Sequence, residues 1–146
     1  MKYKLKLFTE GFSREEIEDV ELNFVSIKNE IFNIELQNSL TVDKDTFQRI
    51  ISKPIINTLT FDNSFTKYLK KTNLPKTIAL KLKFILFSLA TNQYTQLPPN
   101  YRVHSIDKEI SGHYVVRLNG DDSVLFKPEG KIIQVRDIAS HSKRGY

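Results

Sequence analysis

Hydrophobic and polar positions follow two different rhythms along this chain, and the change falls after Leu97-Pro98-Pro99. Before this point, apolar residues recur at spacings of three and four in several segments, as on one face of a helix. After it, apolar and polar residues alternate, as in half-buried strands. The pattern therefore predicts an α+β fold in which helices precede a small antiparallel sheet.

The middle of the chain is expected to hold a strand followed by an antiparallel helical hairpin. Residues 55–61 are rich in β-branched residues and read as the strand. Asp62 or Ser64 can cap the first helix, and residues 73–75 form a break with a proline suited to the first turn of the next helix. The second helix covers residues 78–89, with Lys81 predicted to lie off its apolar stripe.

Four strands are predicted in the last third, over residues 101–106, 113–118, 123–127 and 131–138. The pair Asn119-Gly120 is a strong hairpin signal, because both residues tolerate positive φ. Closely spaced strands with such turns form an antiparallel meander. Alternation along the strands would place Arg102, His104, His113 and Arg117 on one open face.

The first 54 residues are harder to interpret. Residues 2–8 alternate as a short strand, and residues 46–51 resemble a short helix that ends before Pro54. Residues 17–34 fit one helical face, but residues 20–24 and 32–36 also alternate as two strands, so both alternatives stay open. We expect residues 1–54 to be an extension or accessory module and residues 55–146 to be the main domain.

The distribution of charge changes the picture more than the net charge of +5 does. Residues 1–60 hold 8 Lys and Arg against 10 Asp and Glu, whereas residues 61–146 hold 14 against 7. A basic half suits a polyanionic partner, although solubility alone is an equally good reason for it. Cysteine is absent, and no apolar run approaches the roughly 20 residues that a bilayer requires. We expect a cytoplasmic protein that does not enter membranes.

All three histidines, His104, His113 and His141, lie in the basic half. RNA can be cleaved without metal if a base takes the 2′-hydroxyl proton, an acid protonates the leaving 5′-oxygen and cations stabilise the charge that develops. Histidines near Arg117 can supply these roles, and Asp121 can orient a histidine or contact a base. No glycine-rich phosphate loop, HExxH helix or metal-ligand cluster stands out, so neither a metal nor a cofactor is expected.

The ordered motifs of residues 97–146 resemble the RelE/ParE superfamily of bacterial toxins, closest to the YafQ-like mRNA endonucleases. The resemblance rests on four stretches, namely residues 97–104, Ser111-Gly112-His113-Tyr114 with Arg117, residues 123–127, and Asp137-Ile138-Ala139-Ser140-His141-Ser142. It implies the toxin of a toxin–antitoxin pair that cleaves mRNA at the ribosome and thereby inhibits translation. The implied partners are mRNA, the ribosome and a cognate antitoxin.

Carried over by position, the resemblance implies catalytic roles for His104, His141, Arg117 and Asp121. The basic and aromatic residues expected to contact RNA are Arg102, His113, Lys127, Arg136, Lys143, Arg144 and Tyr146. Ser123 stands where many RelE-like members carry an arginine, and residues 1–54 have no counterpart in a minimal toxin. The alternatives are therefore a non-enzymatic protein on the same fold, either a ParE-type gyrase inhibitor or a silent interaction module, and, less favoured, a secreted competition toxin.

Overall fold

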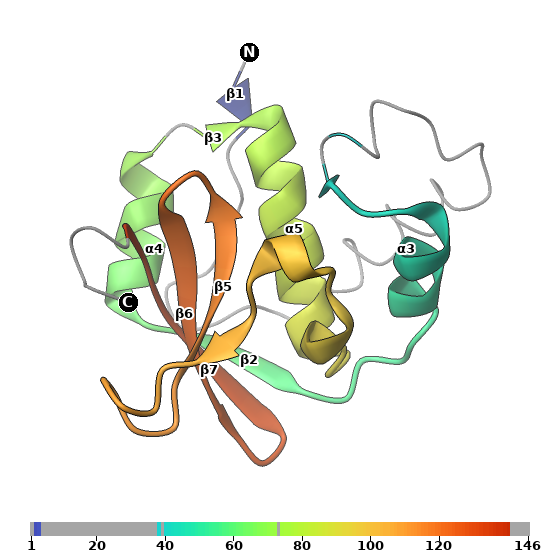
Figure 1. Ribbon diagram of the computed structural model, residues 1–146. Coiled ribbons are helices and arrows are strands. Elements are labelled where there is room, and N and C mark those ends of the chain that lie inside the picture. The colour runs from blue at the N-terminus through green and yellow to red at the C-terminus, as the bar shows by residue number, and fades with distance from the viewer. Residues whose placement is uncertain (1, 4–37, 39, 73, 141–146) are drawn as a thin grey trace.

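A mixed sheet with helices against one face dominates the computed structural model, which describes residues 2–3, 38, 40–72 and 74–140 (Figure 1). Within these residues the sheet has five strands, in the spatial order β2-β7-β6-β5-β4. They are β2 (Thr58–Phe61), β4 (His104–Ser105), β5 (Tyr114–Asn119), β6 (Asp122–Glu129) and β7 (Ile132–Ser140). The predicted α+β class is confirmed.

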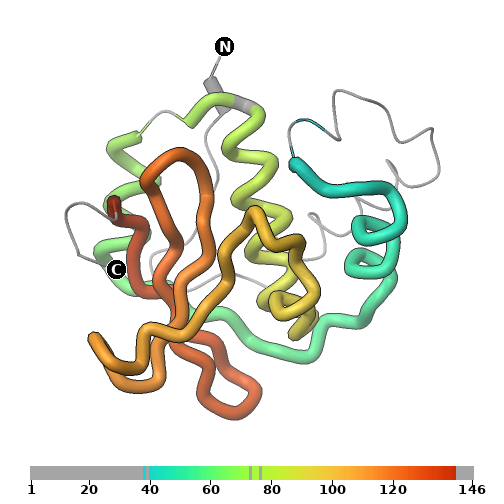
Figure 2. The backbone as a smooth tube through the Cα atoms, in the orientation of Figure 1, coloured from blue at the N-terminus to red at the C-terminus, as the bar shows by residue number. Residues whose placement is uncertain are grey.

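The helical hairpin is also confirmed. Helix α4 (Asn63–Lys71) and helix α5 (Lys76–Ala90) are joined at one end by β3 (Leu74–Pro75), and the backbone path reverses there (Figure 2). Pro75 stands at the N-cap of α5 rather than inside its first turn. β3 pairs with β1 (Lys2–Tyr3), which is the described part of the strand expected over residues 2–8. The segments expected over residues 17–34 lie outside the described residues.

The strands of the meander pair as expected, but β2 makes the sheet mixed. β4, β5, β6 and β7 are antiparallel neighbours, whereas β2 lies parallel to β7 with Thr58 opposite Ile132. Between Leu125 and Phe126 the pairing shifts, so β7 carries one extra residue, Arg136, at a β-bulge. A bulge re-aims side chains locally, and this one turns Arg136 towards the start of α4.

Two predicted strands are shorter than expected, for reasons of backbone hydrogen bonding. Residues 55–57 do not join the sheet, because the amides of Ile56 and Asn57 both donate to the carbonyl of Ala90 at the end of α5. Residues 99–101 form a 3₁₀ turn, η2 (Pro99–Tyr101), because Pro98 and Pro99 lack amide hydrogens. Only His104 and Ser105 remain as β4.

The main core lies between the helices and one face of the sheet. Its strand residues are Leu59, Phe61, Val116, Leu118, Val124, Phe126, Ile133, Val135 and Ile138. Helices α4 and α5 contribute Phe65, Leu69, Leu82, Ile85 and Leu86. Burying such side chains stabilises a fold by about 1.5–3 kcal/mol each.

The prediction that Lys81 lies on the solvent side of α5 is wrong. Lys81 is 8% exposed, and its Nζ lies 4.7 Å from the centre of the Tyr101 ring. Helix α5 is buried almost all round from Ala79 to Ala90, so it has no wide polar face on which a lysine could be solvated. Within the described residues, no helix is both long and apolar enough to cross a bilayer.

Part of the N-terminal extension shares the main core. Helix α3 (Lys44–Ile51) begins slightly before the predicted residue 46, and Asp43 caps it by accepting a hydrogen bond from the Thr46 amide at 2.7 Å. The Phe47 ring is fully buried and stacks on Phe84 of α5, with 5.7 Å between ring centres. The division at residue 54 stays a prediction, but residues 40–51 pack against the domain rather than apart from it.

Candidate functional site

The face of the sheet opposite the main core carries the candidate site. Cross-strand register sets His104, Val115, Leu125 and Asp137 in one row across β4, β5, β6 and β7. The next row holds Arg117, Ser123 and Ala139. Because side chains two residues apart share a face, His104 and Arg117 are diagonal neighbours about 7–8 Å apart at the backbone. The predicted shared face is thus present for these two residues.

A loop covers part of this face. Ile106 and Ile110 pack on Val115 and Leu125 in a second, small apolar cluster. The loop is held closed by the Gly112 amide, which donates to Asp107 Oδ1 at 2.6 Å. We call His104, which is exposed, together with the partly exposed Arg117, Ser123 and Ala139, the open-face site.

His104 is exposed, yet its ring is oriented. Its Nδ1 lies 2.7 Å from the carbonyl oxygen of Arg102. A carbonyl can only accept, so Nδ1 carries the hydrogen and Nε2 keeps its lone pair in the neutral ring. An oriented imidazole with Nε2 directed away from its anchor is suited to accept a proton from a ligand.

Arg117 is half-buried on β5, and its Nε is enclosed without a hydrogen-bond partner in the structure. A guanidinium has five donors and no acceptor, so Arg117 is chemically suited to bind an anion such as a phosphate group. Burial lowers the pKa of Lys81, and the positive charge of Arg117 lowers it further. Two positive charges that act on each other favour the binding of a phosphate group. Lys81 was missed as a contributor because the helical pattern placed it in solvent.

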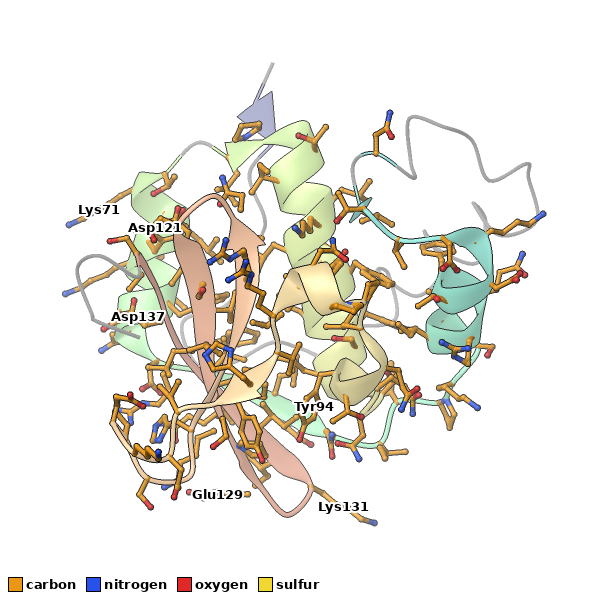
Figure 3. All side chains as sticks on the ribbon, in the orientation of Figure 1. Lys71, Tyr94, Asp121, Glu129, Lys131 and Asp137 are labelled. Carbon is orange, nitrogen blue, oxygen red and sulfur yellow. The ribbon has the colours of Figure 1, made fainter. Side chains whose placement is uncertain are left out.

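Asp121 lies in the turn between β5 and β6, at the same end of the sheet as Arg117 and Ser123. Its side chain is exposed, and Gly120 before it adopts a φ of +48° that glycine accepts without strain. Figure 3 shows Asp121 at the tip of this hairpin, while Glu129 and Lys131 lie at the opposite end of β6 and β7. Asp121 therefore borders the open-face site rather than lying within it.

His113 and Arg136 take part in a hydrogen-bond network with Asp62. His113 is 3% exposed, and its Nδ1 donates to the carbonyl of Ser111 at 2.8 Å. Its Nε2 therefore accepts from Nη1 of Arg136 at 3.0 Å, and Nε of Arg136 donates to Asp62 Oδ2 at 2.9 Å. Because both ring nitrogens are occupied inside the protein, we do not carry His113 into the proposed RNA interface.

The sequence predicts Asp62 as a helix cap, but its carboxylate instead accepts hydrogen bonds from β7. It stands at the N-cap of α4 without a capping bond from its side chain, and it accepts from Gln134 Nε2 at 2.8 Å as well as from Arg136. The carboxylate thus ties the start of α4 to the bulge of β7. Nε of Arg136 is engaged in this ion pair, and the predicted contact of Arg136 with RNA stays a prediction.

Replacing Asp62 with alanine is expected to lower the free energy of unfolding by about 1–3 kcal/mol, because Arg136 and Gln134 lose a charged acceptor. Denaturation in urea measures the change. Ser64→Ala is the matched control, since Ser64 is exposed in the first turn of the same helix and should change stability little. Equal stability of Asp62→Ala and the control would contradict the network.

Lys127 lies far from the open-face site. It pairs across the sheet with Gln134, four residues along β6 from Ser123 and hence roughly 13 Å away. Its Nζ lies 2.7 Å from Glu129 Oε1, and this hydrogen bond and charge lower the pKa of Glu129. Lys127 can contact only a ligand that runs along the length of the sheet.

The remaining predicted residues, His141, Lys143, Arg144 and Tyr146, lie outside the described residues, so their positions stay predictions. Ser140, the last described residue, pairs with Asp122 at the end of β7, one residue beyond the Ala139 of the open-face site. Among the described residues, no group of three or more His, Cys, Asp or Glu side chains is arranged to hold a metal ion.

The fold described above is that of YafQ-like proteins. A histidine-to-glutamine variant of YafQ from E. coli superposes with a TM-score of 0.51 at 17% sequence identity, over 60% of this chain and 96% of YafQ. The E. coli DinJ–YafQ complex matches over the same shares, with a TM-score of 0.49 at 18% identity. No protein-family model and no curated protein sequence matches this chain.

The match includes nearly all of YafQ but leaves about two fifths of this chain outside it. At this level of identity the comparison establishes the fold, which agrees with the resemblance seen in the motifs. What the chain does must be argued from its own side chains, because one fold can carry different functions.

Proposed function

We propose that this protein is the toxin of a bacterial toxin–antitoxin pair and acts as a metal-independent endoribonuclease on mRNA at the ribosome. The observation that carries the proposal is that an oriented, exposed His104 and the half-buried Arg117 lie on the same face of the sheet. That face belongs to the basic part of the chain and to a fold shared with YafQ, a toxin in the DinJ–YafQ toxin–antitoxin complex of E. coli.

In the proposed reaction, Nε2 of neutral His104 takes the proton of a ribose 2′-hydroxyl. The 2′-oxygen attacks the adjacent phosphorus, and the bond to the 5′-oxygen of the next nucleotide breaks. Arg117, in the field of Lys81, stabilises the charge on the phosphate oxygens. His141 is assigned the role of acid that protonates the leaving 5′-oxygen. The products are a 2′,3′-cyclic phosphate and a 5′-hydroxyl.

The other residues are assigned supporting roles. Asp121, beside the hairpin turn, is proposed to position a histidine or a base. Arg102, Lys127, Lys143 and Arg144 are proposed to contact the RNA backbone, and Tyr146 is proposed to stack on a base. The proposed partners are mRNA, the ribosome and a cognate antitoxin, which implies action in the cytoplasm.

Controlled expression in a bacterial host tests the function directly. We expect growth arrest, together with new mRNA 5′ ends mapped by primer extension within translated regions.

Arg117→Ala should reduce cleavage by roughly 100- to 1,000-fold, as expected when one donor to a developing negative charge is lost. Lys131→Ala is the matched control, because it also removes one positive charge but lies exposed at the opposite end of the sheet. Equal cleavage by both variants would contradict the assignment of Arg117.

Ser123 supports a second candidate, a non-enzymatic protein on the same fold. Ser123 pairs with Arg117 across the sheet and stands where many RelE-like proteins carry an arginine, so the site has one cation fewer. A gyrase inhibitor of the ParE type would stop growth with intact mRNA and induce DNA damage. The same expression experiment therefore separates the two candidates.

A further inference from the structure

The N-terminal extension makes specific contacts with the short 3₁₀ turn η2, besides its apolar packing. Nδ2 of Asn100 donates to Thr41 Oγ1 at 2.8 Å and to the Thr41 carbonyl at 3.2 Å. The hydroxyl of the next residue, Tyr101, donates to the carbonyl of Leu40. Two consecutive residues of η2 thus hold two consecutive residues of the extension, across 59 and 61 positions of sequence.

Tyr101 is rigidly placed from its other side as well. Its ring is fully buried, lies edge-on to Phe84 with 6.2 Å between centres, and carries Lys81 above it. Phe84 in turn stacks on Phe47 of the extension. Burial raises the pKa of Tyr101, so its hydroxyl stays protonated and donates to Leu40 throughout the physiological range.

From η2 the contacts lead directly to His104. The Arg102 amide donates to the carbonyl of Pro99, and Arg102 adopts the left-handed conformation, with a φ of 48°. This conformation directs the Arg102 carbonyl to Nδ1 of His104. Thr41, at the other end of the contact, also has a positive φ of 52°. Such a conformation is costly for a β-branched residue and persists only where surrounding contacts hold it.

We infer that Leu40 and Thr41 form a positioning clamp for His104, acting through Asn100, Tyr101 and the carbonyl of Arg102. The inference rests on the proposed function and deepens it, because it assigns part of the extension, a region without counterpart in a minimal toxin, to the active site. Leu40 and Thr41 are positioning residues and do not touch the substrate. Without the clamp, η2 would keep the packing of Tyr101 against Phe84 but lose its hydrogen bonds to the extension, so Nε2 of His104 would be less well aligned with the 2′-hydroxyl.

The test compares two replacements of Thr41. Thr41→Val keeps the shape and β-branching but removes the hydroxyl that Asn100 contacts, whereas Thr41→Ser keeps the hydroxyl. We expect Thr41→Val to lower kcat of mRNA cleavage roughly 10- to 100-fold, as expected for a small misplacement of a reacting group, with KM nearly unchanged. Thr41→Ser should restore most of the rate.

Thr66→Val is the control for a purely structural effect. Thr66 is a buried threonine of α4, which packs against β7, and its hydroxyl donates to the Asn63 carbonyl at 3.1 Å. Because Thr66 is buried and Thr41 is exposed, this substitution should lower stability at least as much as Thr41→Val while leaving kcat unchanged. A loss of kcat in Thr41→Val no greater than in Thr66→Val would overturn the clamp.

A second readout does not depend on cleavage. The ¹⁵N chemical shifts of the His104 ring report which nitrogen carries the hydrogen, so they report the bond from Nδ1 to Arg102. We expect this single-tautomer signature in the unaltered chain and in Thr41→Ser, and a mixture of tautomers in Thr41→Val and Tyr101→Phe. Unchanged ring shifts in both altered chains would overturn the clamp even if the protein cleaves RNA. If the unaltered protein does not cleave RNA but the ring shifts of His104 still change in Thr41→Val and Tyr101→Phe, the clamp is supported and the proposed function is rejected.

Discussion

Replacing His104 with alanine is expected to reduce the rate of mRNA cleavage by roughly 100- to 10,000-fold, the usual contribution of a positioned general base. The imidazole is exposed and makes one hydrogen bond to the backbone, so its removal should change the free energy of unfolding little. Single-turnover cleavage of mRNA on programmed ribosomes measures the rate, and urea denaturation confirms that the variant is folded.

His104→Gln sharpens this comparison. A glutamine can retain a hydrogen bond to the Arg102 carbonyl, but it cannot take up a proton near neutral pH. The rate should therefore stay as low as in His104→Ala. Recovery of cleavage in the glutamine variant would show that position 104 only anchors the backbone, and the base would have to be sought elsewhere.

Replacing Phe47 with alanine is expected to lower the free energy of unfolding by about 3–5 kcal/mol, the range for removing a buried aromatic ring. Phe47 has no exposed surface and stacks on Phe84 in the core of the main domain. Since small proteins are stable by only about 5–15 kcal/mol, this one change should remove a large part of the total. Urea denaturation followed by circular dichroism gives the value.

Lys44→Ala is the matched control on the same helix, because Lys44 is exposed in its first turn. It should change the free energy of unfolding by less than about 0.5 kcal/mol.

A shortened chain that begins at residue 55 should lose more stability than Phe47→Ala, and we expect it to unfold or aggregate. A shortened chain as stable as the full one would support the separate module over residues 1–54 and contradict the shared core.

Local signals predicted most of the elements. The proline near residue 75 and the turn at Asn119-Gly120 mark boundaries by backbone geometry alone, so α4, α5 and the β5–β6 hairpin lie close to their predicted positions. The shorter β2 could not be predicted, because the bonds from Ile56 and Asn57 to Ala90 join residues more than 30 positions apart. The parallel pairing of β2 with β7 depends on the same distant packing.

The candidate site likewise contains residues that the sequence predicts and residues whose role depends on tertiary contacts. His104 and Arg117 share a face because side chains alternate along any strand, which a sequence shows directly. The same alternation favoured His113 as a site residue, but the loop over residues 106–113 buries it and the bulge at Arg136 supplies its partner. Neither the loop closure nor the bulge has a signal in the order of polar and apolar residues.

By itself, the sequence determined the α+β class, the helical hairpin, the meander and the residue types available for phosphate chemistry, because these follow from backbone preferences and periodicity between near neighbours. Only the tertiary structure decided that Lys81 is buried beside Tyr101, that Asp62 holds Arg136 and that the extension contacts η2. Each of these depends on a contact between residues far apart in sequence, whose formation requires the whole chain to be folded.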